Sequence, residues 1–252
     1  MKQIEFLAAV ILGICVFSFL NRVIDRLVYH MGFAKKRIQC PVCGHALSVS
    51  DMIPVLSFLI SAGKCRCRKA KTPVRHILSE LLGGIVGFLC VFVFGWNLRA
   101  LVAFGFFAVL TVVAFVDLET KEIPNGLVVM AEVIGALSIL FFPEISILER
   151  GIGIVCVSVP MLALTCAVPG MFGGGDIKLM AACGVFLGWK YSLLAIFMAL
   201  LLGGVFSGIL LAARKVSRKE QFSFGPFLCL GILIAFLWGE WILSWYFGMF
   251  GL

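Results

Sequence analysis

Long apolar runs separated by short polar breaks fill most of the chain. A helix needs about 20 predominantly apolar residues to cross a bilayer. The runs that are candidates for such helices are Ile4–Leu20, Ile77–Phe94, Arg99–Val116, Leu127–Phe142, Gly151–Val168, Ile177–Gly188, Tyr191–Ala213 and Phe227–Phe250. The pattern therefore predicts an all-α polytopic membrane protein with about eight transmembrane helices.

The composition supports a membrane protein. Hydrophobic residues make up 62% of the 252 residues and charged residues 13%, whereas soluble globular domains average about 45–50% and about 25%. A soluble globular protein, a disordered chain and a large extramembrane domain are thus excluded. The net charge of +8 is explained by membrane topology and by anionic lipid headgroups as partners, so no nucleic-acid partner is predicted.

Lysine and arginine residues are distributed unevenly between the two sides of the predicted bundle. One side holds 16 of them, in Asn21–His76, Asp117–Gly126, Pro169–Asp176 and Arg214–Gly225, and the other side holds four, which are Lys2, Arg99, Arg150 and Lys190. Because basic loops stay in the cytoplasm, we expect the first side to be cytoplasmic and both termini to face outward. The first apolar run has no small-residue cleavage signature after it and is expected to remain as a span.

This topology predicts three parts of the chain. Residues 1–20 form the first transmembrane helix, residues 21–76 form a cytoplasmic loop that contains cysteines, and residues 77–252 form a seven-helix membrane core. Within these helices the pairs Gly83-x3-Gly87 and Gly204-x3-Gly208 have the spacing that lets helices approach closely. We interpret both pairs as generic packing positions.

Two aspartates stand at the predicted cytoplasmic boundary of the membrane. Asp117 ends the third run, and Asp176 follows Gly173–Gly175 and opens the sixth run. The aspartates are 59 residues apart in sequence, yet the topology places both on the same side. Ionisable groups at membrane depth are costly, which makes each of them a candidate functional residue.

A pair of carboxyl groups brought close together can share a proton, so that one serves as general base and the other as general acid. Such a pair can hydrolyse a peptide bond without a metal ion or a nucleophilic side chain. Glycines before Asp176 permit unusual backbone angles and a close approach of substrate. Alternatively, Asp117 and Asp176 are helix-boundary residues, a solvated end and an N-cap. The residues alone leave both interpretations open.

Several segments, in order along the chain, resemble one known family. Gly173-x-Gly175-Asp176-Ile177-Lys178-Leu179 resembles the G-x-G-D-x-K-L signature of the type IV prepilin peptidases, which are polytopic aspartic proteases. The other similar segments are Phe17-Ser18-Phe19-Leu20-Asn21-Arg22-Val23-Ile24-x-Arg26-Leu27, Cys40-Pro41-Val42-Cys43, Pro54-Val55-Leu56-Ser57-Phe58, Gly63-Lys64-Cys65-Arg66, Arg75-x4-Glu80 and Asp117-Leu118-x4-Ile123-Pro124-Asn125.

The resemblance implies a concrete activity. Members of this family cut the short basic leader from type IV prepilins or type II secretion pseudopilins, on the cytoplasmic side of the bacterial inner membrane. Asp117 and Asp176 would then be the catalytic pair, with Gly173, Gly175 and Lys178 as supporting residues of the motif. Lys178 would act on a neighbouring carboxylate or extend to the lipid headgroups. Many members also methylate the new amino terminus with S-adenosylmethionine.

Four cysteines in the predicted cytoplasmic loop form a pattern close to a zinc site. Cys40-x2-Cys43 is followed by Cys65-x-Cys67, and zinc favours tetrahedral thiolate ligation. The family's second pair has the C-x2-C spacing, and its last position falls here on Arg68. Structural zinc and unliganded reduced thiols both remain open. The altered spacing of the second cysteine pair also leaves open whether methylation is retained, since this loop accompanies that activity in the family.

Two other function classes fit parts of the sequence. A proton-coupled membrane transporter would use the acidic pair to carry protons, although the acids lie near the boundary and the chain has no internal repeat of the transporter kind. A membrane adaptor organised around the cysteine loop would use the aspartates only as helix caps. Cleavage of a prepilin substrate distinguishes the peptidase from both.

Overall fold

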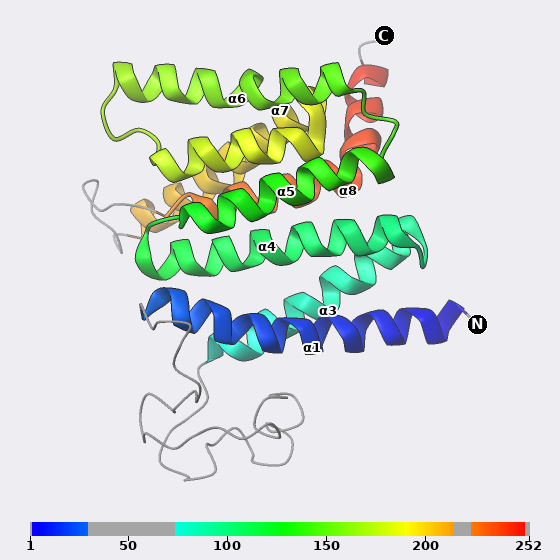
Figure 1. Cartoon of the computed structure of the whole chain (residues 1–252). Helices are drawn as coiled ribbons and strands as arrows, with labels where there is room; N and C mark the ends of the chain where they lie inside the picture. Colours follow the sequence, from blue (N-terminus) through cyan, green and yellow to red (C-terminus); the bar gives the residue numbers. More distant parts are fainter. Residues whose placement is uncertain (1, 30–73, 214–222, 250–252) are drawn as a thin grey trace, which may run out of the picture. The chain divides into compact units, whose positions relative to one another are not determined.

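The computed structural model describes residues 2–29, 74–213 and 223–249, and these residues are largely helical (Figure 1). The helices are α1 (Lys2–Val28), α3 (Val74–Phe94), α4 (Leu98–Thr120), α5 (Asn125–Phe141), α6 (Ile147–Ala167), α7 (Gly174–Ala212) and α8 (Gly225–Met249). Six of them are long and apolar enough to cross a membrane, and α5 is a shorter apolar helix. The all-α polytopic fold class is therefore confirmed, whereas the number of membrane crossings stays a prediction.

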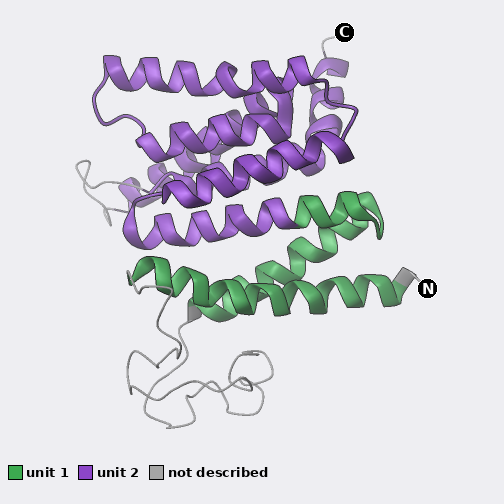
Figure 2. Ribbon diagram, viewed as in Figure 1, with its two compact units in different colours: residues 1–104 green, residues 105–252 purple. Residues whose placement is uncertain are grey.

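The chain divides into two compact units (Figure 2). Unit 1 comprises Met1–Phe104 and contains α1, α3 and the first residues of α4. Unit 2 comprises Gly105–Leu252 and contains the rest of α4 together with α5 to α8. The predicted cysteine loop lies mostly in residues 30–73, outside the described residues.

Glycines let α1 and α3 approach each other closely in unit 1. A Cβ atom at Gly87 would lie 2.6 Å from the carbonyl oxygen of Ala9, and a Cβ atom at Gly13 would collide with the backbone of Gly83. Gly83 and Gly87 therefore are packing positions, as their spacing predicts. The second pair differs, since a Cβ atom at Gly204 or Gly208 would meet open space.

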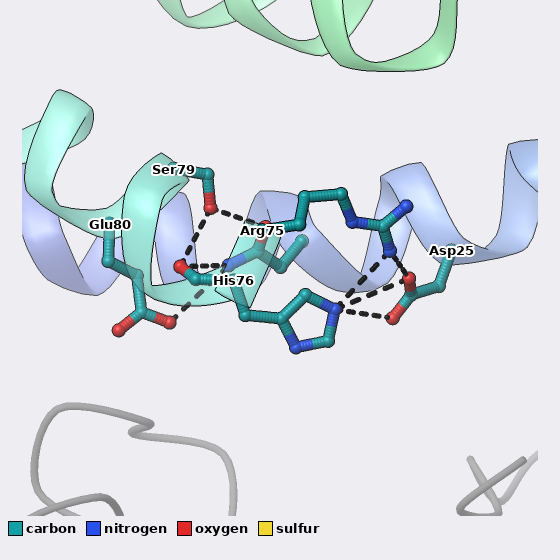
Figure 3. A network of polar contacts seen from close by, with 6 residues as sticks. Asp25, Arg75, His76, Ser79 and Glu80 are labelled. Carbon is teal, nitrogen blue, oxygen red and sulfur yellow. Dashed lines mark hydrogen bonds and ion pairs between the residues drawn. The ribbon is translucent and has the colours of Figure 1, made fainter. Parts of the chain in front are cut away.

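A network of polar side chains joins α1 to the start of α3 (Figure 3). The Ser79 hydroxyl donates to Asn21 Oδ1 at 2.5 Å, and Asn21 Nδ2 donates to Glu80 Oε1 at 3.3 Å. Arg75 forms an ion pair with Asp25. Glu80 is only 1% exposed, so these bonds offset the cost of burying polar groups between the helices.

This network explains why α1 is longer than the predicted span. The apolar run ended at Leu20, but α1 continues to Val28, and α3 begins at Val74 before the predicted Ile77. A prediction from hydropathy ends a span where polar residues start. Here those polar residues remain helical because their partners lie on the neighbouring helix.

Gly188 divides α7 of unit 2 into two arms. The helix has 39 residues, and at ~1.5 Å per residue a straight helix of this size would far exceed a ~30 Å hydrocarbon core. At Gly188 the backbone adopts φ 70° and ψ 175°, which only glycine adopts readily. The arms run in opposite directions, so both ends of α7 lie at the same end of unit 2 (Figure 1). The break falls where the predicted sixth run ended.

Aromatic rings fill the centre of unit 2. The Phe106 ring of α4 stacks on the Phe186 ring of α7, with centroids 3.9 Å apart. Phe236 of α8 lies 4.9 Å from Phe186, and Phe142, directly after α5, lies 5.7 Å from it. This core fixes α4, the first arm of α7 and α8 against one another, because buried aromatic side chains contribute large apolar areas.

A buried arginine organises the end of unit 2 where α5 joins α6. Arg150 is 2% exposed, and its guanidinium donates to Ser138 Oγ, Val185 O and Phe142 O, each at 2.7 Å. The Ser138 hydroxyl lies in the last turn of α5, and the Phe142 carbonyl lies directly after the helix, where carbonyl groups lack helical partners. The sequence placed Arg150 among the basic residues of outward loops. Instead, its side chain ties three segments of unit 2 together.

Candidate functional site

Asp117 lies in the last turn of α4 and is 6% exposed. Its Oδ2 atom accepts a hydrogen bond from the backbone N–H of Gly225 at 3.0 Å and another from the Ser223 hydroxyl. Both donors belong to the segment that begins α8. The two donors on one oxygen therefore fix the orientation of this carboxyl group against the start of α8.

Asp176 lies in the first turn of α7 and is 7% exposed. Its Oδ1 atom is buried and has no hydrogen-bond partner within the described part of the chain. The other oxygen lies beside Gly173, where a Cβ atom would be 3.0 Å away. A buried polar atom without a partner is uncommon in folded proteins and calls for a functional explanation.

The structure brings these two aspartates to the same end of unit 2. The end of α4 and the beginnings of α7 and α8 gather there (Figure 1). The two carboxyl groups lie within electrostatic range of each other, and the Cys229 thiol of α8 lies within range of both. The topology predicted that the two aspartates share one boundary of the membrane, and in the structure they lie near each other at one end of unit 2.

The three glycines before Asp176 have different surroundings. A Cβ atom at Gly175 would lie 2.9 Å from the Cβ atom of Ile123, in the turn between α4 and α5. At Gly173 it would face the Asp176 carboxyl group, and at Gly174 it would meet open space. Gly175 therefore allows the start of α7 to lie against that turn.

Lys178 contacts the same turn rather than either carboxylate. Its Nζ atom donates to Asn125 Oδ1 at 3.1 Å, and the side chain is exposed. This bond joins the second turn of α7 to the start of α5. Lys178 thus holds two site segments together, which is a positional contribution.

Sequence reasoning missed Ser223 and Gly225. A Cβ atom at Gly225 would lie 2.6 Å from Asp117 Oδ2, so the carboxyl group occupies space that only glycine leaves free. The local signal was Gly225-Pro226, a glycine followed by proline at the start of a helix. That signal marks a helix beginning, but it does not reveal a partner 108 residues away.

The structure does not test the predicted metal ligands. Cys40, Cys43, Cys65 and Cys67 all fall outside the described residues. Among residues 2–29, 74–213 and 223–249, no group of three or more His, Cys, Asp or Glu side chains is arranged to hold a metal ion. The zinc site therefore stays a prediction from donor type and spacing.

Comparisons with known proteins cover most of the chain. The family described as bacterial peptidase A24 N-terminal domain matches residues 11–94, and the type IV leader peptidase family matches residues 104–208. A prepilin leader peptidase/N-methyltransferase of Bacillus subtilis is 28% identical over 99% of both chains. A protein of the same name from Burkholderia pseudomallei is 30% identical, over 88% of this chain and 82% of its own length. No solved structure matches.

The apolar helices and these matches define a multi-pass membrane peptidase. More specifically, the chain belongs to the prepilin leader peptidase/N-methyltransferase family, as the resemblance of its motifs indicates. The boundary between the two matched families falls near the division between the two units, at Phe104 and Gly105. Each unit therefore corresponds closely to one family region.

Proposed function

We propose that this protein is an aspartic endopeptidase that removes the leader from type IV prepilins or type II secretion pseudopilins, with Asp117 and Asp176 as the catalytic pair. One observation carries the proposal. Two buried carboxyl groups from separate helices lie within electrostatic range, and one of them has an oxygen without a partner in the described residues. Such a pair can share a proton and divide acid and base work between its members.

The reaction needs four proton transfers between these groups, water and the substrate. The ionised carboxylate takes a proton from a water molecule, and the resulting hydroxide attacks the scissile carbonyl carbon. The protonated carboxyl group donates to the carbonyl oxygen and stabilises the tetrahedral intermediate. When the C–N bond breaks, the proton held by the base passes to the leaving amine, and the hydroxyl group that received a proton from the acid returns it to that carboxylate as the carbonyl re-forms. The carboxyl groups end with one shared proton, ready for another cycle.

The site faces the cytoplasm of the bacterial inner membrane in this proposal. The 16 basic residues on one predicted side support that orientation, since the ends of α4 and α7 that carry the aspartates belong to the same side. A precursor whose apolar helix is already in the bilayer would present its leader there. Anionic headgroups around the basic loops would be the lipid partners.

A co-expressed prepilin precursor tests the peptidase proposal directly. We expect the parent protein to shift the precursor to the mobility of the mature pilin, and Asp117→Asn and Asp176→Asn to leave it uncut. Each variant is first checked for membrane insertion and for a parent-like melting temperature in detergent. Substantial cleavage by either folded variant would remove that aspartate from the mechanism. Absence of cleavage by the parent would favour the transporter or adaptor alternatives.

Methylation of the new amino terminus is a second, separable part of the proposal. The names of the relatives support it, since each includes N-methyltransferase. S-adenosylmethionine would supply the methyl group. Mass spectrometry of pilin processed by the purified protein, with and without S-adenosylmethionine, decides it. A mature pilin without the added methyl mass would show that this chain is a peptidase only.

Structural zinc in the cysteine loop is the third part. The four thiols have the donor type that zinc prefers, and metal binding in small sites stabilises the local fold. We expect zinc to co-purify with the parent and to be lost when Cys40 and Cys43 are both changed to serine. A metal content near zero in the parent, with every cysteine titratable after denaturation, would contradict the metal interpretation.

A further inference from the structure

The Asp117 carboxyl group is held by two donors that come from one short segment. Gly225 N–H and the Ser223 hydroxyl both donate to the same oxygen, Oδ2. Gly225 is the first residue of α8, so its N–H is one of the groups that a helix leaves without an internal partner. The carboxylate therefore occupies the N-terminal end of α8, where the helix dipole also favours negative charge.

The position of this carboxylate depends on the glycine. Any side chain at position 225 would place a carbon atom 2.6 Å from Oδ2 and 2.9 Å from Cγ of Asp117. The carboxyl group would have to rotate away and would lose the backbone donor. Ser223 is partly buried beside it, which protects the hydroxyl bond from competition with water.

Asp176 has different surroundings, since its carboxyl group has a hydrogen bond to the backbone of Gly173, three residues before it. Its Oδ1 atom has no donor in the described residues, and the nearby Asp117 carboxylate opposes a second negative charge. A protonated Oδ1 is suited to donate to a substrate carbonyl. The two carboxyl groups of the pair are thus distinguished by their partners and not by residue type.

We infer that Ser223 and the Gly225 N–H are positioning groups that hold Asp117 as the ionised base, which leaves Asp176 as the acid. This inference rests on the proposed catalytic pair. It assigns a role to the start of α8, a segment that the sequence motifs did not include. In the reaction, the two donors would orient Asp117 so that its other oxygen, Oδ1, takes the proton from water.

Other ionisable groups near Asp117, in space or in sequence, also affect the expected pH dependence. Asp176 on α7 and Cys229 on α8 lie within electrostatic range of Asp117. Glu119 and Lys121 follow Asp117 in the sequence. Lys178 on α7 is bonded to Asn125. Substitution at position 223 leaves all of these groups in place, so a change in the pH profile reports on the lost hydroxyl.

The test measures cleavage of a soluble leader peptide in detergent across pH by the full chain. In Ser223→Ala, we expect kcat to fall about 10- to 100-fold with KM within about twofold, as for loss of a hydrogen bond to a charged group. The acidic limb of the kcat profile should move to higher pH, since the anionic base has lost a donor. Ser223→Thr, which keeps the hydroxyl, should restore both.

Gly225→Ala provides the second variant, with a larger expected loss of kcat because it displaces the carboxyl group. The matched controls are Ser244→Ala and Gly248→Ala, in the same helix. Ser244 bonds only to the local Trp241 carbonyl in the described structure, and a Cβ atom at Gly248 meets open space. Both controls should keep parent activity and the parent profile.

The outcomes separate this inference from the proposed function. If Asp117→Asn and Asp176→Asn are inactive but Ser223→Ala keeps the parent kcat and profile, the positioning role is wrong and the catalytic pair stands. A loss of activity that is equal at every pH and not restored by threonine would also overturn it, because that pattern indicates a structural serine. Activity in either asparagine variant would contradict the proposed pair itself.

Discussion

The two ends of unit 2 both bury charged side chains, but they satisfy them differently. At the end where α5 meets α6, Arg150 donates to three oxygens at 2.7 Å and to Ile145 O at 3.2 Å. At the other end, Asp117 has two donors on one oxygen, and Asp176 Oδ1 has no partner in the described residues. Arg150, Asp117 and Asp176 are each less than a tenth exposed. The two ends are therefore alike in burial and differ in how completely the buried groups are hydrogen-bonded.

This difference distinguishes a charge whose hydrogen bonds are made within the protein from the carboxyl pair that we propose to be catalytic. Leaving a buried polar atom unpaired costs about 1–3 kcal/mol, and folded chains accept such a cost mainly at functional sites. Arg150 offsets its burial through carbonyl groups that the helix ends leave open. The aspartate pair keeps bonding capacity unused, which is what proton exchange with a substrate requires.

The largest expected effect is on activity at the aspartate end. Asp176→Asn should lower cleavage at least about 1,000-fold, because an amide cannot exchange the proton, and general acid–base groups contribute about 10²–10⁴-fold. The melting temperature should not fall, since the amide fits the same space and is uncharged, as the protonated carboxyl group is. Activity and thermal unfolding are measured on the same detergent preparation. A marked loss of stability would contradict the functional interpretation of this carboxyl group.

Arg150→Met should show the reverse pattern. The substitution removes the guanidinium donor from Ser138, Phe142 and Val185, so we expect a loss of about 3 kcal/mol or more of stability. Cleavage per folded molecule should stay within about twofold of the parent, because Arg150 lies at the other end of the unit. Lys190→Met is the matched control. Its exposed contact with Glu149, at 3.8 Å, is worth at most ~1 kcal/mol.

A smaller loss of stability is expected next to the Arg150 end, where α6 crosses the first arm of α7. A Cβ atom at Gly184 would collide with the backbone of Gly153, so Gly184→Ala should cost about 1–3 kcal/mol through overpacking. Gly204→Ala, in the same helix but facing open space, should be neutral or slightly stabilising. Equal melting temperatures for the two variants would show that this helix crossing adjusts freely.

Lys178→Met should have the smallest effect. Its amino group bonds to Asn125 in an exposed position, and exposed polar contacts are worth about 0.2–1 kcal/mol. We therefore expect cleavage within about fivefold of the parent and an unchanged pH profile. A shift of the basic limb to higher pH would show that Lys178 acts on the carboxyl pair, the other role that the sequence left open.

Local patterns in the sequence were enough for the fold class and for the two aspartates. Apolar runs report the solvent around a helix, so the membrane helices and the break near Gly188 follow from residue order. Charge counting placed Asp117 and Asp176 on one side. Family motifs then marked the same two residues. None of these signals required knowledge of which helices touch.

Tertiary structure decided which side chains bond to each other across long sequence separations. Ser223 and Gly225 reach Asp117 over more than 100 residues, and Asn21 reaches Glu80 over 59. Of two equally spaced glycine pairs, only Gly83 and Gly87 lie at a helix crossing. Hydropathy and spacing describe one helix at a time, whereas a hydrogen bond or a close approach depends on the partner that packing supplies. For this reason the sequence identified the catalytic candidates, and the three-dimensional arrangement distinguished their environments.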